Sequence, residues 1–388
     1  MVWNVVTRND IFKINTFLEF VMKILHCADL HLDSVMNTHF TIDKAKDRKA
    51  EILDTFCNMV KYAADNGVNA IIIAGDLYDK RNISATARNT VFCQITGHPE
   101  IIFYYLKGNH DAESFLDGMK DIPANLKMFE NEWTSYIVGE EYGRKIVITG
   151  VELTNNNDIY NSLVLRTEDF NIVVLHGQET KSASKDTTKV ISLKDLKNKN
   201  IDYLALGHVH SYKEGCLDSR GVYCYSGCLE GRGFDECGEH GFVMLDIDVK
   251  NNSFKREFVN IAKRNIYSLE VDITGCVNSM EISDRIWQII KEKKYDRRHL
   301  VKIILTGDVD VECEKNEEFL NKHFENEFYC IKIKDESRLM INYDDFMYDE
   351  SLKGEFVRTV KADLTLTDEE KATVIRYGIQ ALKGEELQ

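Results

Sequence analysis

The chain has 388 residues, of which 44% are hydrophobic, and its formal net charge is −15 at pH 7. This length and apolar content are enough for one large domain and a smaller one. The acidic balance argues against tight non-specific binding of DNA by the chain alone, because phosphate contacts need Lys and Arg. Since no run of about 18 apolar residues occurs, we expect no membrane-spanning segment.

Residues 1–21 carry neither the basic start nor the cleavage site of a signal peptide, so we interpret them as an N-terminal extension. The ten cysteines lack paired spacing, which indicates free thiols in a reducing cytoplasm. The alternative is a zinc knuckle built from four cysteines that lie close together in the sequence. These four are Cys216, Cys224, Cys228 and Cys237.

Strand and helix patterns alternate over residues 22–263. Apolar runs rich in β-formers predict buried strands at MKILHCA, AIIIA, IIFYYLK, FNIVVL and DYLAL. Amphipathic helices are expected over 43–67 and 84–97, each ending at a glycine. Further short strands are expected around 134–151, 170–176, 202–216, 221–227 and 241–262. The pattern fits a four-layer α/β/β/α sandwich, in which helices cover two sheets.

A second alternation of strands and helices begins near Arg264. Strands are expected at IYSLEVDI, HLVKIILTGDV and FYCIKIKD, with helices at EISDRIWQIIKEKKY and NEEFLNKHFEN between them. This β-α-β-α-β order predicts a smaller α/β domain over residues 264–345. Residues 346–388 are expected to form a helical tail, with a capping box at Thr367 and Glu370.

Each of the two tail helices carries an apolar stripe. The stripes are Leu352, Phe356, Val357 and Val360 in the first helix, and Ala372, Ile375, Ile379 and Leu382 in the second. One interpretation is that both stripes pack on the body of this chain. The other is that the tail docks a partner protein.

Residues of the kinds that bind metal ions follow each of the five buried strands. They are Asp29 and His31, then Asp76 and Asp79, then Asn109, His110 and Asp111, then His176, and finally His208 and His210. In open α/β sheets the ligand crevice lies outside the carboxyl ends of the strands, so these side chains are expected to line one cleft. Taken singly, each motif also fits a turn or a helix cap. Five such motifs in order argue against coincidence.

The ligand chemistry narrows the kind of metal site. Imidazole mixed with carboxylate and amide oxygen suits manganese, iron or zinc, and several such groups in one cleft indicate a dinuclear site. Glycines next to the ligands are expected to allow close approach of the backbone. They are Gly75, Gly108, Gly177 and Gly207.

The order of these motifs resembles the calcineurin-like metallophosphoesterase superfamily. The segments HCADLHLDS, AGDLYDK, LKGNHD, LALGHVH and YSGCLEGRGFDECGEHGF are similar to the SbcD-type bacterial DNA repair exonucleases, and in particular to their YhaO-like branch. The resemblance spans about residues 22–245. It implies the four-layer fold, with the second domain acting as a cap over the cleft.

The resemblance also implies roles for the residues of the cleft. One metal ion would be held by Asp29, His31, Asp76 and His210, and the other by Asp76, Asn109, His176 and His208, so that Asp76 forms the bridge. His110 would be the catalytic acid that contacts the phosphate. Asp79 would handle the phosphate or anchor a ligand through a hydrogen bond. Further candidates for these supporting roles are Asp111, Arg81 and Arg232.

The function implied by the resemblance is a cytoplasmic, manganese-dependent DNA exonuclease with some endonuclease activity, with iron or zinc as alternative ions. Its partners would be DNA, an SbcC-like SMC-type ATPase that docks on the tail, and a second copy of the chain. One alternative is a phosphodiesterase or phosphatase that acts on a small molecule, although such a substrate needs neither the second domain nor the tail. The other alternative is a non-catalytic scaffold subunit, against which the complete ligand set argues.

Overall fold

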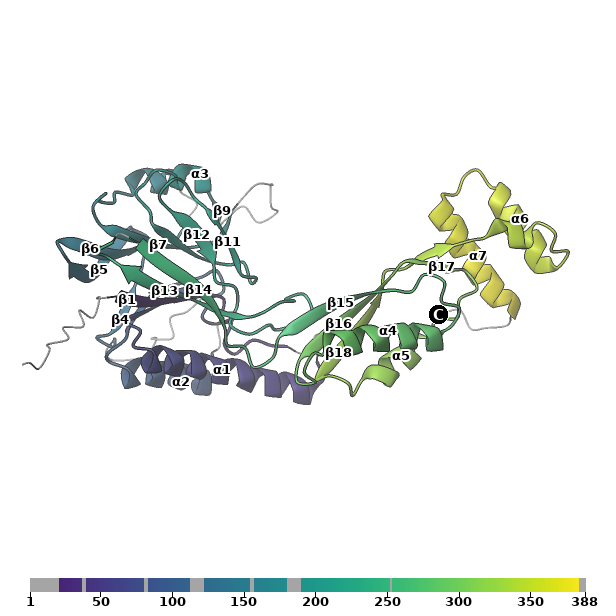
Figure 1. The fold of residues 1–388 in the computed structure, drawn as a ribbon, viewed down its shortest axis with the longest axis horizontal. Coiled ribbons are helices and arrows are strands. Elements are labelled where there is room, and N and C mark those ends of the chain that lie inside the picture. The colour runs from purple at the N-terminus through teal and green to yellow at the C-terminus, as the bar shows by residue number, and fades with distance from the viewer. Residues whose placement is uncertain are drawn as a thin grey trace, which may run out of the picture.

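The computed structural model describes residues 21–36, 40–79, 83–111, 122–153, 157–179, 190–251 and 253–383. The molecule is elongated, with two large sheets at one end, a smaller sheet in the middle and a helical hairpin at the other end (Figure 1). None of the helices in these ranges combines the length and the apolar character that a membrane span needs.

The first sheet has six strands in the order β14-β13-β1-β2-β3-β4. Its strands are β1 (Val21–Cys27), β2 (Ala70–Ala74), β3 (Ile102–Leu106), β4 (Leu126–Met128), β13 (Gly241–Asp248) and β14 (Ser253–Asn260). The strands β1 to β4 run parallel, and β13 pairs antiparallel with β1. Every residue of β2 is buried, as the apolar run AIIIA predicts.

Two helices cover the outer face of the first sheet: α1 (Ile42–Asp65) and α2 (Ala85–Gly97). The side chains of Thr41 and Ser84 accept hydrogen bonds from the first turn of α1 and α2, respectively, and so cap them. Both predicted helices are confirmed, with ends that differ by no more than two residues.

The second sheet also has six strands, in the order β11-β12-β10-β7-β6-β5. Its strands are β5 (Thr134–Glu141), β6 (Arg144–Gly150), β7 (Phe170–His176), β10 (Tyr203–Gly207), β11 (Lys213–Cys216) and β12 (Val222–Tyr225). A short parallel pair joins β8 (Gln178–Glu179) to β9 (Val190–Ile191). The predicted strands of this region are confirmed, whereas β4, β8 and β9 were not predicted.

The two sheets pack face to face. Ile24 and Ile72 of the first sheet share a buried apolar cluster with Ile148 and Ile172 of the second. The outer face of the second sheet packs against η1 (Asn157–Ser162) and α3 (Leu193–Leu196), through the cluster that contains Tyr160 and Leu196. The predicted α/β/β/α order is therefore confirmed, and the described helices of the second outer layer are much shorter than α1.

A three-stranded parallel sheet follows, in the order β15-β16-β18. Its elements are β15 (Ile266–Asp272), α4 (Ser279–Lys293), β16 (Leu300–Thr306), α5 (Glu317–Phe324) and β18 (Cys330–Asp335). Ile282 and Leu320 of the two helices are buried against Val301 and Ile303 of the central strand. The predicted β-α-β-α-β order is confirmed. A second parallel pair, β17 (Asp308–Asp310) and β19 (Arg338–Met340), was not predicted.

The tail contains η3 (Tyr343–Phe346), α6 (Leu352–Ala362) and α7 (Asp368–Lys383). The predicted capping box is confirmed, because Glu370 Oε2 accepts the Thr367 N–H at 2.8 Å and Thr367 Oγ1 accepts the Glu370 N–H at 3.3 Å. The predicted stripes are buried in their middle parts, where Val357 and Ile375 share a cluster with Phe346 and Val311.

The stripe prediction was wrong at the helix ends. Leu352 is 71% exposed and Leu382 is 44% exposed. Each lies in an end turn of its helix, so it falls outside the contact that the middle turns make. The tail therefore forms its own small core with residues of the preceding segment.

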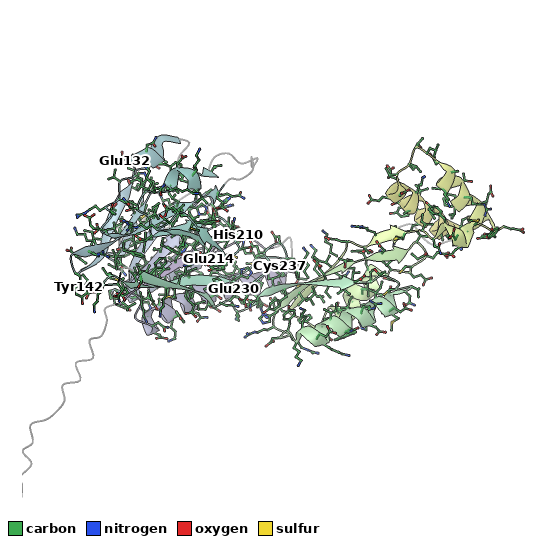
Figure 2. The ribbon with its side chains drawn as sticks, turned by 45° about the horizontal axis from the view of Figure 1, so that its top comes forward. Glu132, Tyr142, His210, Glu214, Glu230 and Cys237 are labelled. Carbon is green, nitrogen blue, oxygen red and sulfur yellow. The ribbon has the colours of Figure 1, made fainter. Side chains whose placement is uncertain are left out.

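Buried charges connect the sheet pair to the β15–β16–β18 sheet at a site that we call the junction. Arg48 of α1 is fully buried and donates hydrogen bonds to Glu51 at 2.6 Å and to Glu230 at 2.7 Å. Arg264 donates to Glu51 at 2.7 Å and stacks over the Tyr329 ring at 3.6 Å from its centroid. Figure 2 labels Glu230 on the side of the sheet pair that faces the smaller sheet. The boundaries 22–263, 264–345 and 346–388 stay predictions.

Candidate metal centre

Five strands deliver the predicted metal-binding residues to one cleft. Asp29 lies just beyond the end of β1, Asp76 just beyond β2 and Asn109 just beyond β3. His176 is the last residue of β7, and His208 directly follows β10. The first three come from one sheet and the last two from the other, so the cleft lies where the carboxyl ends of the parallel strands of both sheets meet.

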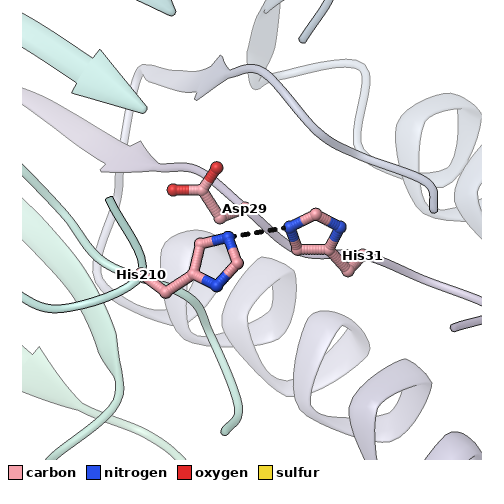
Figure 3. Close-up of side chains that lie close together, drawn as sticks. All are labelled: Asp29, His31 and His210. Atoms are coloured by element: carbon pink, nitrogen blue, oxygen red, sulfur yellow. Dashed lines mark hydrogen bonds between the residues drawn. The ribbon is translucent and has the colours of Figure 1, made fainter. Parts of the chain in front are cut away.

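Within the cleft the side chains form two groups. Asp29, His31 and His210 make up the first, and their ligand atoms all lie within 4.8 Å of one another. Figure 3 shows the Nε2 atoms of His31 and His210 facing each other, at 3.2 Å. Asp76, His176 and His208 make up the second group, by the same measure.

Asp76 lies between the two groups. Its Oδ2 atom is 3.9 Å from His31 Nε2 and 3.3 Å from His176 Nε2. Asn109 belongs beside the second group, because its Oδ1 atom is 2.8 Å from His176 Nε2 and 3.3 Å from His208 Nδ1. This placement agrees with the predicted division of the ligands and with Asp76 as the bridge, and we retain both as proposals.

Unusual backbone angles mark four of these residues. Asp29, His31, Asp76 and His208 have φ values of 53°, 45°, 51° and 101°. Each such residue costs about 1–3 kcal/mol and persists only where its surroundings hold it in place. Two backbone hydrogen bonds do so here, from Asp29 N to Gly75 O at 3.0 Å and from His31 N to Asp76 O at 2.9 Å. Such strain is characteristic of functional sites.

Glycines leave the space that the ligands occupy. An added Cβ would lie 2.1 Å from His176 Nδ1 at Gly75 and 2.0 Å from Asp76 Oδ1 at Gly108. At Gly207 it would lie 1.9 Å from a backbone oxygen. The close approach predicted at these three glycines is confirmed.

The charges of the second group favour a cation. Burial raises the pKa of Asp76, but the hydrogen bond and charge of His176 outweigh it and hold this pKa well below its usual value. Burial lowers the pKa of His176, and Asp76 more than reverses this effect. Burial and the charge of His176 lower the pKa of His208. A shared positive charge between these groups is therefore stabilised, and a proton supplies it in the metal-free protein.

Hydrogen bonds orient the histidines. His176 Nδ1 lies 2.9 Å from the Ala74 carbonyl oxygen, which can only accept, so Nδ1 carries the proton and the Nε2 lone pair faces Asp76. His31 Nδ1 lies 3.2 Å from Asp79 Oδ1, and Ser34 Oγ donates to Asp79 Oδ2 at 2.7 Å. Burial raises the pKa of Asp79, but its contacts with His31 and Ser34 lower it to about 2. This geometry favours the anchoring role of Asp79.

His110 lies at the mouth of the cleft. Its side chain is 47% exposed, with Nδ1 3.4 Å from Asp79 Oδ1 and its ring centroid 5.3 Å from that of His31. Its backbone N–H donates to Asp76 Oδ1 at 2.9 Å. The exposed ring can therefore meet a substrate, while its backbone holds the proposed bridging carboxylate.

Asp111 and Arg81 were predicted to support ligands or to handle the phosphate. Asp111 is buried and accepts backbone N–H groups from Leu77, Tyr78 and Gly108 at 3.2, 2.8 and 2.9 Å. It therefore ties together the two loops that carry Asp76 and Asn109, which favours the supporting role. Arg81 lies outside the described residues.

Sequence reasoning missed Glu236. Its Oε1 atom lies 2.7 Å from His210 Nδ1, and Arg232 donates to the same oxygen at 2.8 Å through Nη2. The signal was available in the segment FDECGEHGF, which belongs to the quoted resemblance but follows no buried strand of the five. Arg232, a predicted supporting residue, does lie beside the first group.

The cysteines take no part in either ligand group. All ten are free thiols, as predicted. Among the residues that the structure describes, each metal-type group consists of Asp and His alone, so the alternative of a zinc knuckle finds no support there.

Comparison with known families gives the site its context. Residues 22–212 match the family described as Calcineurin-like phosphoesterase. These residues are a calcineurin-like metallophosphoesterase domain. Together with the two ligand groups, this membership supports a metal-dependent hydrolase with two divalent metal ions.

Similarity to individual proteins extends beyond this metallophosphoesterase domain. The chain is 26% identical over 296 residues to "Uncharacterized metallophosphoesterase YhaO" of Bacillus subtilis, which covers 74% of this chain and 72% of that protein. It is 22% identical over 308 residues to "DNA double-strand break repair protein Mre11" of Sulfolobus acidocaldarius, covering 75% and 76%. It is 26% identical over 109 residues to the SbcD component of the nuclease SbcCD of Rhodobacter capsulatus, covering 27% and 25%.

Proposed function

We propose that this protein is a manganese-dependent nuclease that hydrolyses phosphodiester bonds of DNA, as the nuclease subunit of an SbcCD-like repair complex. The observation that carries the proposal is the position of Asp76 between two ligand groups. A single carboxylate within reach of both groups is what a pair of neighbouring cations needs for a bridge. Imidazole, carboxylate and amide ligands together suit manganese, with iron and zinc as alternatives.

The residues of the cleft divide the chemistry among them. Asp29, His31, Asp76 and His210 would hold one ion, and Asp76, Asn109, His176 and His208 the other. Bound divalent cations would activate water and neutralise the negative charge that develops on the phosphate. His110, whose half-exposed ring lies at the mouth of the cleft, would donate a proton to the leaving oxygen.

Two observations support DNA as the substrate. Two of the similar proteins are named for DNA repair or nuclease activity, and the similarity to the Sulfolobus protein covers 75% of this chain. The matched part is therefore longer than the metallophosphoesterase domain over 22–212. A small phosphoester needs no second sheet beside the cleft, whereas a DNA strand extends beyond it. The net charge of −15 implies that this chain alone binds DNA modestly.

The deciding experiment uses the full chain with Mn²⁺ and labelled duplex, single-stranded and hairpin DNA. Bis-nitrophenyl phosphate serves as the small substrate, and the Asp76→Ala variant controls for contaminating nuclease. We expect cleavage of DNA by the wild-type chain alone. Cleavage of the small ester without DNA would favour the small-molecule enzyme, and cleavage of neither would favour a scaffold.

The tail supplies the proposed docking surface for an SbcC-like SMC-type ATPase. The middle turns of α6 and α7 bury their stripes in a local core, but Leu364 is 95% exposed and Val374 and Tyr377 are 39% and 44% exposed. Replacing Val374 and Tyr377 by serine should weaken co-purification with the ATPase while DNA cleavage persists. Unchanged co-purification would place the contact elsewhere. Ten free thiols support a cytoplasmic setting for the complex.

A further inference from the structure

A buried carboxylate stands behind each histidine of the first ligand group. His31 has Asp79 at its Nδ1 atom, at 3.2 Å, and His210 has Glu236 at its Nδ1 atom, at 2.7 Å. Both rings therefore present Nε2 to each other, at 3.2 Å. Asp79 was a candidate for this role from sequence, whereas Glu236 lies on the loop between β12 and β13.

Glu236 is held in a fixed position by its own loop. Its Oε2 atom accepts the backbone N–H of Arg232 at 2.7 Å, and its Oε1 atom accepts Nε and Nη2 of the same residue at 3.1 and 2.8 Å. Its backbone carbonyl lies 2.9 Å from Nε2 of the buried His240, and Cys228 Sγ lies 3.8 Å from Oε2. The carboxylate is buried, with 7% of its surface exposed.

The contact between Glu236 and His210 selects one tautomer of the ring. An ionised carboxylate oxygen can only accept, so an unprotonated Nδ1 at 2.7 Å would place two lone pairs against each other. Nδ1 must therefore carry the proton and donate it to Oε1, which leaves the Nε2 lone pair directed at the first ligand group. Arg232 Nη2 also lies 3.1 Å from Nδ1, but Oε1 is the acceptor that it serves.

Arg232 is occupied by these carboxylates. Its Nη1 atom is 3.6 Å from Asp79 Oδ1, while Nε and Nη2 bind Glu236. Its side chain is only 21% exposed. One guanidinium thus contacts the carboxylates behind both histidines of the first group, and little of its surface is left for a substrate phosphate.

We propose that Glu236 is a positioning residue that fixes the tautomer and direction of His210, with Arg232 holding Glu236 and Asp79 in place instead of binding the phosphate. This inference rests on the proposed two-metal site. It adds to that proposal the residues that tune one half of the site, while the other half is oriented by the Ala74 carbonyl.

The test measures Mn²⁺ binding to the full chain by equilibrium titration, for wild type, Glu236→Gln and the control Glu239→Gln. Glu239 lies on the same loop and is exposed. We expect wild type and the control to bind two ions with the same affinities. In Glu236→Gln one of the two affinities should fall by about 10–100-fold and the other should stay unchanged, because partners that orient a ligand have effects of this size.

A double-mutant cycle separates positioning from general support of the fold. In the background of His210→Ala, the substitution Glu236→Gln should cause no further loss of Mn²⁺ affinity, because the residue acts through that ring. Equal weakening of both ions, or losses that add to those of His210→Ala, would overturn the inference. If a thermal melt shows that Glu236→Gln is unfolded, Glu236→Asp, which keeps the charge for Arg232, replaces it in the same cycle.

Arg232 is tested by the variant Arg232→Gln. A positioning role predicts weaker binding of one Mn²⁺ ion, with an unchanged KM for bis-nitrophenyl phosphate at saturating Mn²⁺. A raised KM with unchanged metal binding would assign Arg232 to the phosphate and overturn that part of the inference. A wild-type chain that binds no transition metal would instead contradict the proposed function, so the two failures are distinguishable.

Discussion

The cleft and the junction both bury charged side chains, but they balance the charges in different ways. At the junction Arg48 lies between Glu51 and Glu230, at 2.6 and 2.7 Å, so each carboxylate has a guanidinium partner. In the cleft Asp76 faces His176 and the His110 N–H, and Asp29 accepts the His208 N–H at 2.9 Å. These are weaker or conditional sources of positive charge.

The difference shows what each region is built to do. A buried carboxylate is costly unless it is paired, and the junction satisfies this need internally. The cleft has two groups of carboxylates and imidazoles whose lone pairs converge, with strained backbone at four residues. Such an arrangement is balanced best by cations from outside. The junction therefore serves stability, and the cleft gives up stability for metal binding.

Removing the proposed bridge should have the largest effect on this contrast. Asp76→Ala takes a ligand from both groups at once, so we expect both metal ions to be lost and turnover to fall to background. Elemental analysis of the purified variant checks the metal content. Asp65→Ala, an exposed residue at the end of α1, is the matched control and should keep both ions. Retention of either ion by Asp76→Ala would contradict the bridging role.

His110→Ala should separate catalysis from metal binding. The side chain stands beside the ligands without belonging to either group, so both ions should remain. Loss of an acid of this kind lowers turnover by about 10²–10⁴-fold. Steady-state cleavage of DNA, together with metal content, gives the result. Wild-type turnover would remove His110 from the proposed chemistry.

Arg48→Met tests the junction. Loss of the guanidinium leaves Glu230 buried without its charged partner, which should lower the free energy of unfolding by about 3–5 kcal/mol. Chemical denaturation measures this, and Lys46→Met on the exposed face of the same helix should change it by less than about 0.5 kcal/mol. Metal stoichiometry of the folded variant should stay at the wild-type value. A loss of metal would show that the two regions are not independent.

Gly108→Ala sharpens the account of the cleft. The added Cβ would lie 2.0 Å from Asp76 Oδ1, so the carboxylate must shift and Mn²⁺ affinity should fall by about 10–100-fold. Gly97→Ala provides the control, because its Cβ would meet nothing within 4 Å. Titration with Mn²⁺ compares the two. Equal affinities would mean that the loop adapts without cost.

The tail supplies a baseline for both regions, because its exposed surface contributes to neither. Leu364 is 95% exposed, so Leu364→Ser should change the free energy of unfolding by less than about 0.5 kcal/mol. The same measurement on Ile375→Ala, at a fully buried position, should give a loss of about 2–5 kcal/mol. Similar values for both variants would mean that the local core of the tail contributes little.

The sequence alone determined the layered fold and the convergence of the cleft. Apolar runs gave the strands, and helical periodicity gave α1, α2, α4, α5 and the tail. Because the carboxyl ends of parallel strands meet at one edge, motifs that follow successive strands had to come together. This argument needs only local patterns, which is why Asp29, Asp76, Asn109, His176 and His208 were found.

Only the tertiary structure decided which groups face one another. The contact between His210 and Glu236 joins residues 26 apart, and that between Arg48 and Glu230 joins residues 182 apart. Likewise, Asp111 follows a metal-binding motif but accepts three backbone N–H groups instead of facing the cleft. Local patterns fix the period and the ends of elements. The pairing of buried charges depends on packing between distant segments, because each polar group must find its partner wherever the fold brings one within hydrogen-bond distance.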